Sequence, residues 1–179
     1  MSRILIAVAL ATALVTLCPT QSRAEIKIHL DPAPQWRQAE DLDALVEILE
    51  SWLDAESSWE RREEKPKIRL SSSAEASARL GATASFQRGR LRGLYDPDGS
   101  VIVLVRPWNP SRAEDVSVLL HELVHHRQAP LHWYCPAAQE LSAYRLQDAW
   151  LNERGLRADV NWVAVVLDAG CTPRDIHPG

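Results

Sequence analysis

The residues best suited to chemistry lie in one short stretch, residues 117–126, which contains the pattern H-E-x-x-H. On a helix, His121 and His125 are four residues apart, so they lie on one face about 40° apart. Two imidazoles at this spacing can hold one Zn²⁺ ion at about 2.0–2.1 Å. Glu122 lies about 100° further round the helix, beside such an ion, where a general base is expected. The pattern therefore predicts a zinc centre with Glu122 as the catalytic residue.

The surroundings of the pattern bear on the alternative, a buried pair of histidines without a metal. Apolar side chains occupy most of the circumference of the predicted helix, so the helix is expected to be buried. Two histidines and a glutamate are costly to bury unless their polar atoms find partners. A metal ion would supply such a partner, whereas the alternative needs protein groups alone. The apolar residues are Val116, Leu119, Leu120, Leu123 and Val124.

A catalytic zinc site needs three protein ligands, so one must come from outside the pattern. His126 directly follows the second motif histidine and points about 100° away from it. The longer pattern H-E-x-x-H-x-x-G-x-x-H would need glycine at position 128 and histidine at position 131, but the chain has Gln128 and Leu131 there. His132 therefore does not fit this pattern. Glu140 opens the next predicted helix, and a helix–loop–helix of this length can turn back toward the metal. We therefore predict that Glu140 is the third ligand, with His132 as the alternative.

The elements that must position these residues follow from hydrophobic periodicity and turn signals. They predict an α+β domain with a small antiparallel or mixed sheet, in which a hairpin packs on a long backing helix. The hairpin, residues 91–105, turns at Asp96-Pro-Asp-Gly99 and stands directly before the metal-binding helix. The expected strands are 25–30 and 67–71, and the expected helices are 35–59, 74–80, 112–128, 139–154 and 159–168.

The N-terminus resembles a secretory signal peptide. Arg3 precedes an apolar run at residues 4–17, and Ser22-Arg-Ala24 fits the small-x-small cleavage pattern. The apolar run is about 14 residues, short of the roughly 20 that span a bilayer. We therefore predict a signal peptide at residues 1–24, a single domain at 25–179 and a periplasmic or secreted protein without a stable membrane anchor. A retained anchor is the alternative.

Cysteine content and charge bear on the exported form. Cleavage would remove Cys18 and leave Cys135 and Cys171, and an even pair in an exported chain favours a disulfide over free thiols or zinc ligands. Removing Arg3 and Arg23 from 20 basic residues leaves 18 against 24 acidic ones. A net charge of about −6 argues against a nucleic-acid partner.

The motif together with a glutamate on the following helix resembles the gluzincin branch of the zincin metallopeptidases. More narrowly, residues 93–96, the apolar strand 101–105, residues 117–126 and residues 140–147 are similar to a family of small exported bacterial proteins of uncharacterised function. The resemblance implies a minimal zincin-like domain in which residues 101–105 form the edge strand that binds an extended peptide. It also implies that His121, His125 and Glu140 bind zinc.

In this implied mechanism Glu122 accepts a proton from water that attacks a peptide carbonyl. A further donor should stabilise the resulting oxyanion, and the candidates are Tyr144, Tyr134 and His132, each of which could instead serve packing. Partners that orient the imidazoles are also expected. Asp148 and Asp115 are possible partners, and both could equally be surface charges.

The sequence therefore leaves three competing functions, of which the third is a periplasmic binding or scaffold module without a metal. The first is an exported zinc-dependent metallopeptidase that acts on a peptide or protein substrate. The second is a non-catalytic zincin-fold domain with a structural or vestigial metal site, acting as a periplasmic binding or interaction module. The intact Glu122 favours the peptidase, because a structural site needs no base. The small size of the chain favours the module. No pattern in the sequence indicates an oligomeric state.

Overall fold

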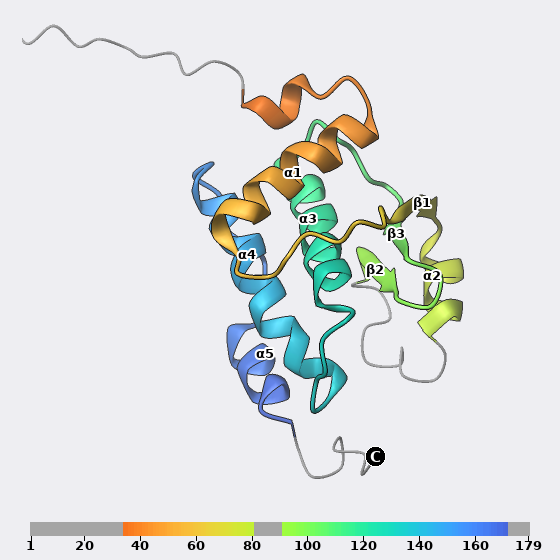
Figure 1. The fold of residues 1–179 in the computed structure, drawn as a ribbon, viewed down its shortest axis with the longest axis vertical. Helices are drawn as coiled ribbons and strands as arrows, with labels where there is room; N and C mark the ends of the chain where they lie inside the picture. Colours follow the sequence, from red (N-terminus) through yellow and green to blue (C-terminus); the bar gives the residue numbers. More distant parts are fainter. Residues whose placement is uncertain (1–33, 81–90, 172–179) are drawn as a thin grey trace, which may run out of the picture. The chain divides into compact units, whose positions relative to one another are not determined.

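The computed structural model describes residues 34–80 and 91–171, which all belong to one compact unit, Pro32–Gly179. The predicted signal peptide, the predicted strand at 25–30 and the start of the predicted domain lie outside the described residues. The rest is a mixed α+β fold, as predicted (Figure 1). Its elements in order are η1 (Gln35–Gln38), α1 (Leu42–Glu56), β1 (Lys67–Ser71), α2 (Ser73–Leu80), β2 (Gly93–Asp96), β3 (Val101–Val105), α3 (Ala113–Gln128), η3 (Pro136–Gln139), α4 (Glu140–Asn152) and α5 (Trp162–Ala169).

The sheet has three strands in the order β1-β3-β2. β3 pairs parallel with β1 and antiparallel with β2, so the predicted hairpin is confirmed. The prediction that Val101–Val105 is an edge strand is wrong, because this strand is central and the edge beside α3 is β2. All five residues of β3 are buried. A continuous β-branched run is typical of a strand covered on both faces, which explains the difference.

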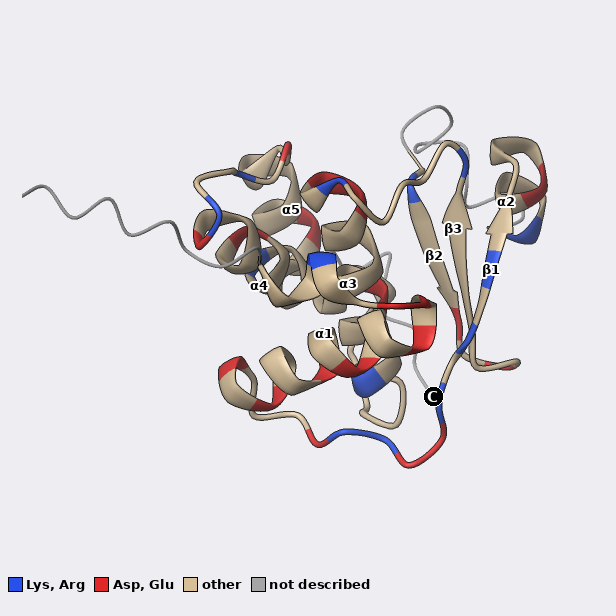
Figure 2. Ribbon diagram, turned by 90° about the horizontal axis from the view of Figure 1, so that it is seen from above, with Lys and Arg blue, Asp and Glu red and all other residues tan. Residues whose placement is uncertain are grey.

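Each face of the sheet meets a different helical layer. Ile102 and Leu104 of β3 join the main core with α1 and α3, whereas Val101, Val103 and Val105 pack toward Ala76 of α2. This alternation is the period-two pattern of a strand. Seen from above, the sheet stands between α2 and the larger helical layer (Figure 2).

α3 is the most enclosed helix of the fold. It packs against α4, β2, β3 and α1, and nearly all of its residues are buried. Leu119, Leu120, Leu123 and Val124 are fully buried, as the sequence predicted. Polar residues on this helix are therefore removed from water and need partners from the neighbouring elements.

Two predicted helices differ in extent from those observed. The predicted helix at 35–59 is divided into η1 and α1, because Asp41 adopts an extended conformation and its carboxylate accepts a hydrogen bond from Ala44 N. This is an N-cap, which starts a new helix. The last helix begins at Trp162 rather than near Asp159, since Asn161 provides the cap.

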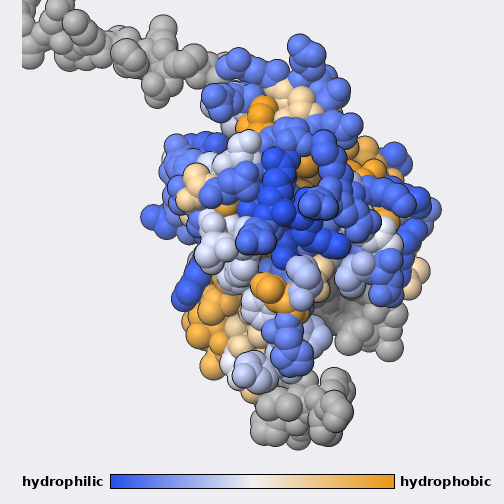
Figure 3. Space-filling view, viewed as in Figure 1, coloured by the Kyte–Doolittle hydropathy of each residue, from blue (hydrophilic) through white to orange (hydrophobic). Residues whose placement is uncertain are grey.

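Cys135 and Cys171 form a disulfide, as predicted, which ties the start of η3 to the end of α5. A disulfide is typical of exported proteins. No helix among the described residues has both the length and the apolar character required to span a bilayer. The face of the molecule drawn in Figure 3 is largely hydrophilic, with apolar side chains gathered over α5, where Val163, Val166 and Leu167 are exposed.

Candidate metal centre

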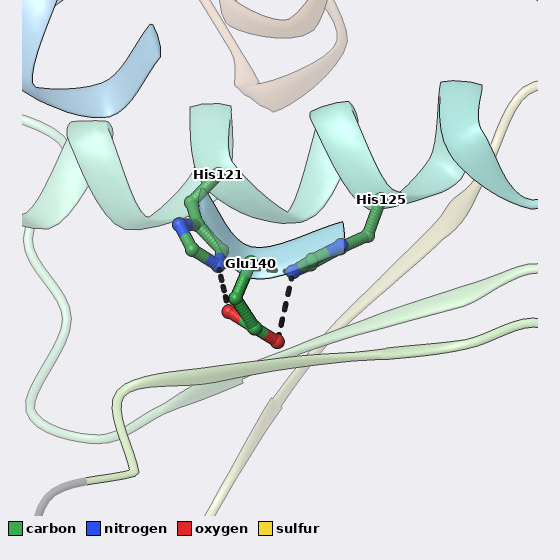
Figure 4. Close-up of side chains that lie close together, drawn as sticks. All are labelled: His121, His125 and Glu140. Atoms are coloured by element: carbon green, nitrogen blue, oxygen red, sulfur yellow. Dashed lines mark hydrogen bonds and ion pairs between the residues drawn. The ribbon is translucent and has the colours of Figure 1, made fainter. Parts of the chain in front are cut away.

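Three of the predicted residues meet where α3 passes the start of α4 (Figure 4). His121 Nε2 lies 3.0 Å from His125 Nε2 and 3.3 Å from Glu140 Oε2, and His125 Nε2 lies 3.5 Å from Glu140 Oε1. Ligand atoms about 2.0–2.1 Å from one tetrahedral Zn²⁺ lie about 3.3 Å from each other. The spacing of these nitrogen and carboxylate oxygen atoms therefore fits a single zinc ion.

Glu140 reaches this position because the chain reverses within a short, tied-down connection. Trp133 Nε1 donates to Gln128 O at the end of α3. Pro136 then opens η3, which leads directly into Glu140, the first residue of α4. The disulfide at Cys135 fixes the residue before this turn. The third predicted ligand is thus placed by the loop and the disulfide as well as by helix packing.

A chain of hydrogen bonds orients the ring of His121. Its Nδ1 lies 3.1 Å from Gln147 Oε1, and Gln147 Nε2 donates to Ser117 Oγ at 3.0 Å. Ser117 Oγ donates in turn to Glu114 O. Because the serine proton is committed to that carbonyl, its oxygen accepts from the amide nitrogen, and the amide oxygen faces the ring. His121 therefore carries its proton on Nδ1 and presents the Nε2 lone pair to the cluster.

A second chain of the same kind orients His125. Its Nδ1 lies 3.0 Å from Gln128 Oε1, and Gln128 Nε2 donates to Ser142 Oγ at 2.8 Å. Ser142 Oγ donates to Gln139 O. His125 Nε2 is thus also directed into the cluster. Two imidazole lone pairs that face each other at 3.0 Å repel unless a proton or a metal ion lies between them, and metal-binding histidines are oriented by such partners on the other ring nitrogen.

The charges of the cluster also favour a bound cation. Burial opposes ionisation of Glu140, but the interactions of its carboxyl with the imidazoles of His121 and His125 outweigh burial and hold its pKa well below the ordinary value. Burial likewise opposes a charge on His125, but the hydrogen bond and negative charge of Glu140 outweigh it and raise the pKa of the imidazole. Both shifts favour positive charge beside the Glu140 carboxylate, which a bound cation would also supply.

Glu122 lies beside the cluster and is not one of its ligands. Its side chain is buried, and burial raises the pKa of the carboxyl. The positive charge that His121 and His125 can carry and a hydrogen bond from the backbone N–H of Tyr95 oppose that rise. A carboxylate with a raised pKa beside a metal site has the properties of a general base.

The three candidates for stabilising an oxyanion are placed differently. The ring of Tyr144 lies 4.5 Å from that of His121, and burial, followed by the charges of Glu140 and Glu122, raises the pKa of its phenol to about 12. It therefore remains a hydrogen-bond donor at neutral pH. Tyr134 is 79% exposed and its ring pairs with that of His132, which is also exposed. The structure thus brings Tyr144 to the cluster and leaves the other two on the surface.

The possible partners for the imidazoles have other roles. Asp148 accepts hydrogen bonds from Ala158 N and Asn152, and Asp115 accepts from Arg92 and Asn109 N. The two glutamines that do orient the histidines were missed. The available signal was positional, because Gln128 follows His125 by three residues on one helix and Gln147 follows Glu140 by seven on the next.

Comparison with known proteins gives a family for this chain. No curated protein and no solved structure matches it. A family model described as "Domain of unknown function (DUF6647)" matches residues 38–179. That range contains His121, His125, Glu140 and both glutamines, and it covers most of the sequence. The chain therefore belongs to the DUF6647 domain family.

Proposed function

We propose that this protein is an exported zinc-dependent metallopeptidase with a minimal zincin-like fold, acting on a peptide or protein substrate. The observation that carries the proposal is the pair of hydrogen-bonded chains that direct two imidazole lone pairs at the Glu140 carboxylate. A histidine pair that served packing alone would not need both rings held in the same tautomer. Bound there, Zn²⁺ would act as a Lewis acid toward water and a substrate carbonyl.

The protein's own residues can complete the reaction. Glu122 accepts the proton of the attacking water and passes it to the leaving amine. The phenol of Tyr144, beside His121, donates to the oxygen of the tetrahedral intermediate. β2 is the edge strand beside α3, so it takes the role that the resemblance gave to Val101–Val105, which is to pair with an extended substrate. Glu140 is one-third exposed, so the cluster is open to solvent on its side.

One observation favours the alternative, a non-catalytic zincin-fold module with a structural metal. Only 5% of Glu122 is exposed, and the residue is enclosed between α3 and β2. An enclosed carboxyl could serve packing alone. The two functions make opposite predictions for a change that removes the base and leaves the ligands intact.

The test is Glu122→Gln, with Glu114→Gln on the exposed side of the same helix as the matched control. Zinc content is measured by elemental analysis, and hydrolysis on a peptide library with and without a chelator. Both variants should retain zinc, and Glu122→Gln should lose a factor of about 10²–10⁴ in kcat. Hydrolysis that survives Glu122→Gln contradicts the mechanism. Zinc without any hydrolysis in the unaltered protein supports the module, and a protein that binds no zinc contradicts both.

A further inference from the structure

Glu122 packs directly against the backbone of the edge strand. A β-carbon built on Gly93 would lie 2.5 Å from Glu122 Oε1, 2.9 Å from Glu122 Cγ and 2.8 Å from Val118 Cγ1. Contacts this short are well inside the sum of the atomic radii, so any side chain at this position would displace its neighbours. Gly93 lies in a β-strand, and its φ angle is not in the positive range that favours glycine. Gly93 is therefore required by space and not by backbone geometry.

Tyr95, two residues along the same strand, faces the same side and anchors the strand to α3. Its ring meets that of His126 edge-on at 5.4 Å. His126 Nε2 donates to Glu64 O at 2.8 Å, so its Nδ1 is free to accept from the Tyr95 hydroxyl at 3.1 Å. The hydroxyl in turn accepts from Arg62 Nη1 at 2.9 Å. The Tyr95 hydroxyl thus connects β2 both to α3, through His126, and to the segment before β1, through Arg62.

The same strand touches the base through its backbone as well. The backbone N–H of Tyr95 contributes to lowering the pKa of the Glu122 carboxyl, against the larger effect of burial, so it lies near that carboxyl. Glu122 is therefore confined by the bare Cα of Gly93 on one side. His126 follows His125 directly and would be superfluous in a site that needed only the metal ligands. Its contacts show instead that it fixes the strand against which Glu122 lies.

We infer that β2 positions the general base: Gly93 is the positioning residue that leaves room for the Glu122 carboxylate, and the Tyr95–His126 contact holds the strand in place. The inference rests on the proposed function, because it assigns Glu122 a catalytic task. A methyl group at Gly93 should push the carboxylate away from its place beside the metal cluster. The ligands on the other face of α3 should keep their geometry.

The experiment compares Gly93→Ala with Gly99→Ala in the turn of the same hairpin. A β-carbon on Gly99 would meet its nearest atom, Val101 Cγ2, at 3.1 Å, and Gly99 is exposed, so this change is a matched control. Gly93→Ala should lower kcat by about 100-fold, as expected for a displacement near 1 Å. KM and the Kd for zinc should stay within about threefold. Turnover unchanged in Gly93→Ala, or lost equally in Gly99→Ala, overturns the inference.

A stability measurement tests the contact without using turnover. In zinc-loaded protein, Gly93→Ala should lower Tm by about 3–10 °C, because the methyl group and the carboxylate compete for one space. In a Glu122→Ala background this loss should shrink by half or more. Equal losses in both backgrounds overturn the inference. If Gly93→Ala does not fold, the pair Gly93→Ala with Val118→Ala relieves the other short contact and is compared in the same two backgrounds.

The two measurements separate the inference from the proposed function. Unaltered protein that binds zinc and cleaves nothing removes the peptidase proposal, while the Tm comparison still decides whether Gly93 and Glu122 are coupled. Active protein whose turnover resists Gly93→Ala keeps the peptidase proposal and removes the positioning role of β2.

Discussion

Replacing Gln147 by methionine should weaken zinc binding without touching a ligand. The methionine keeps the approximate length and volume of the side chain but removes the amide oxygen that lies 3.1 Å from His121 Nδ1. Gln147 is buried, so water cannot readily take the place of the oxygen. The hydroxyl of Ser117 keeps its own bond to Glu114 O, and the damage is confined to the imidazole.

The loss falls on the zinc-bound state, which sets its size. To bind zinc through Nε2, His121 must keep its proton on Nδ1, where methionine offers no strong acceptor. A buried donor left unsatisfied costs about 1–3 kcal/mol. The metal-free variant loses less stability, because the His121 ring can then carry its proton on Nε2 and donate it to Glu140. The expected net loss is about 10–100-fold in affinity, or about 1.4–2.8 kcal/mol, the range found when such partners are removed.

The assay is competition for zinc against a chromogenic chelator at fixed pH. Arg145→Met, an exposed position on the same helix, controls for methionine in α4 and should leave the Kd unchanged. Gln147→Glu should also retain affinity, since its carboxylate still accepts from Nδ1. A Kd for Gln147→Met within threefold of the unaltered protein would show that the hydrogen-bonded chain does not orient the ring, and the main support for the zinc proposal would be lost.

Two further predictions concern the disulfide that fixes the residue before η3 and the competition between protons and zinc. Replacing Cys135 and Cys171 together by serine opens a loop of 36 residues, so the free energy of unfolding should fall by about 4 kcal/mol. The zinc Kd should rise, because η3 is no longer fixed before Glu140. An unchanged Kd would show that the disulfide does not help to place Glu140. The pKa of His125 is raised above 6.5 in the metal-free protein, so the stability it adds through Glu140 is present below pH 6.5 and lost as pH rises through the raised pKa. The increase in Tm on adding zinc should therefore grow from pH 6 to pH 8, and an increase that shrinks over this range contradicts the assignment.

The meeting of His121, His125 and Glu140 could be predicted because most of the information is local. The spacing of His121 and His125 places both on one helical face whatever the rest of the chain does. Glu140 required one further step, a reversal within a connection whose length and proline content are visible in the sequence. Residue types that rarely lie in a buried helix also indicated α3 as the candidate functional element before any packing was known.

The partners of these ligands could not be predicted, because they depend on the register between helices. Gln147 reaches His121 only if α4 lies antiparallel to α3 at one particular offset, and nothing local fixes that offset. The order of the strands was missed for a similar reason. The apolar run Val101–Val105 indicates burial, but a hairpin leaves open which of its two strands a third will join.

The polar residues of α3 show how a helix that is buried on nearly every side can carry so many of them. The two motif histidines face α4, Glu122 faces β2, and His126 is bound by Tyr95 and Glu64. Arg127 donates to the backbone oxygen of Glu50 at 2.8 Å and pairs with its carboxylate. Each of these residues is matched by protein groups. At the Nε2 atoms of the histidine pair those groups are only each other, 3.0 Å apart, and the Glu140 carboxylate at 3.3 and 3.5 Å. We propose that a cation binds at this point, where a nitrogen pair faces a carboxylate, and the titration of Tm with zinc and pH tests that proposal directly.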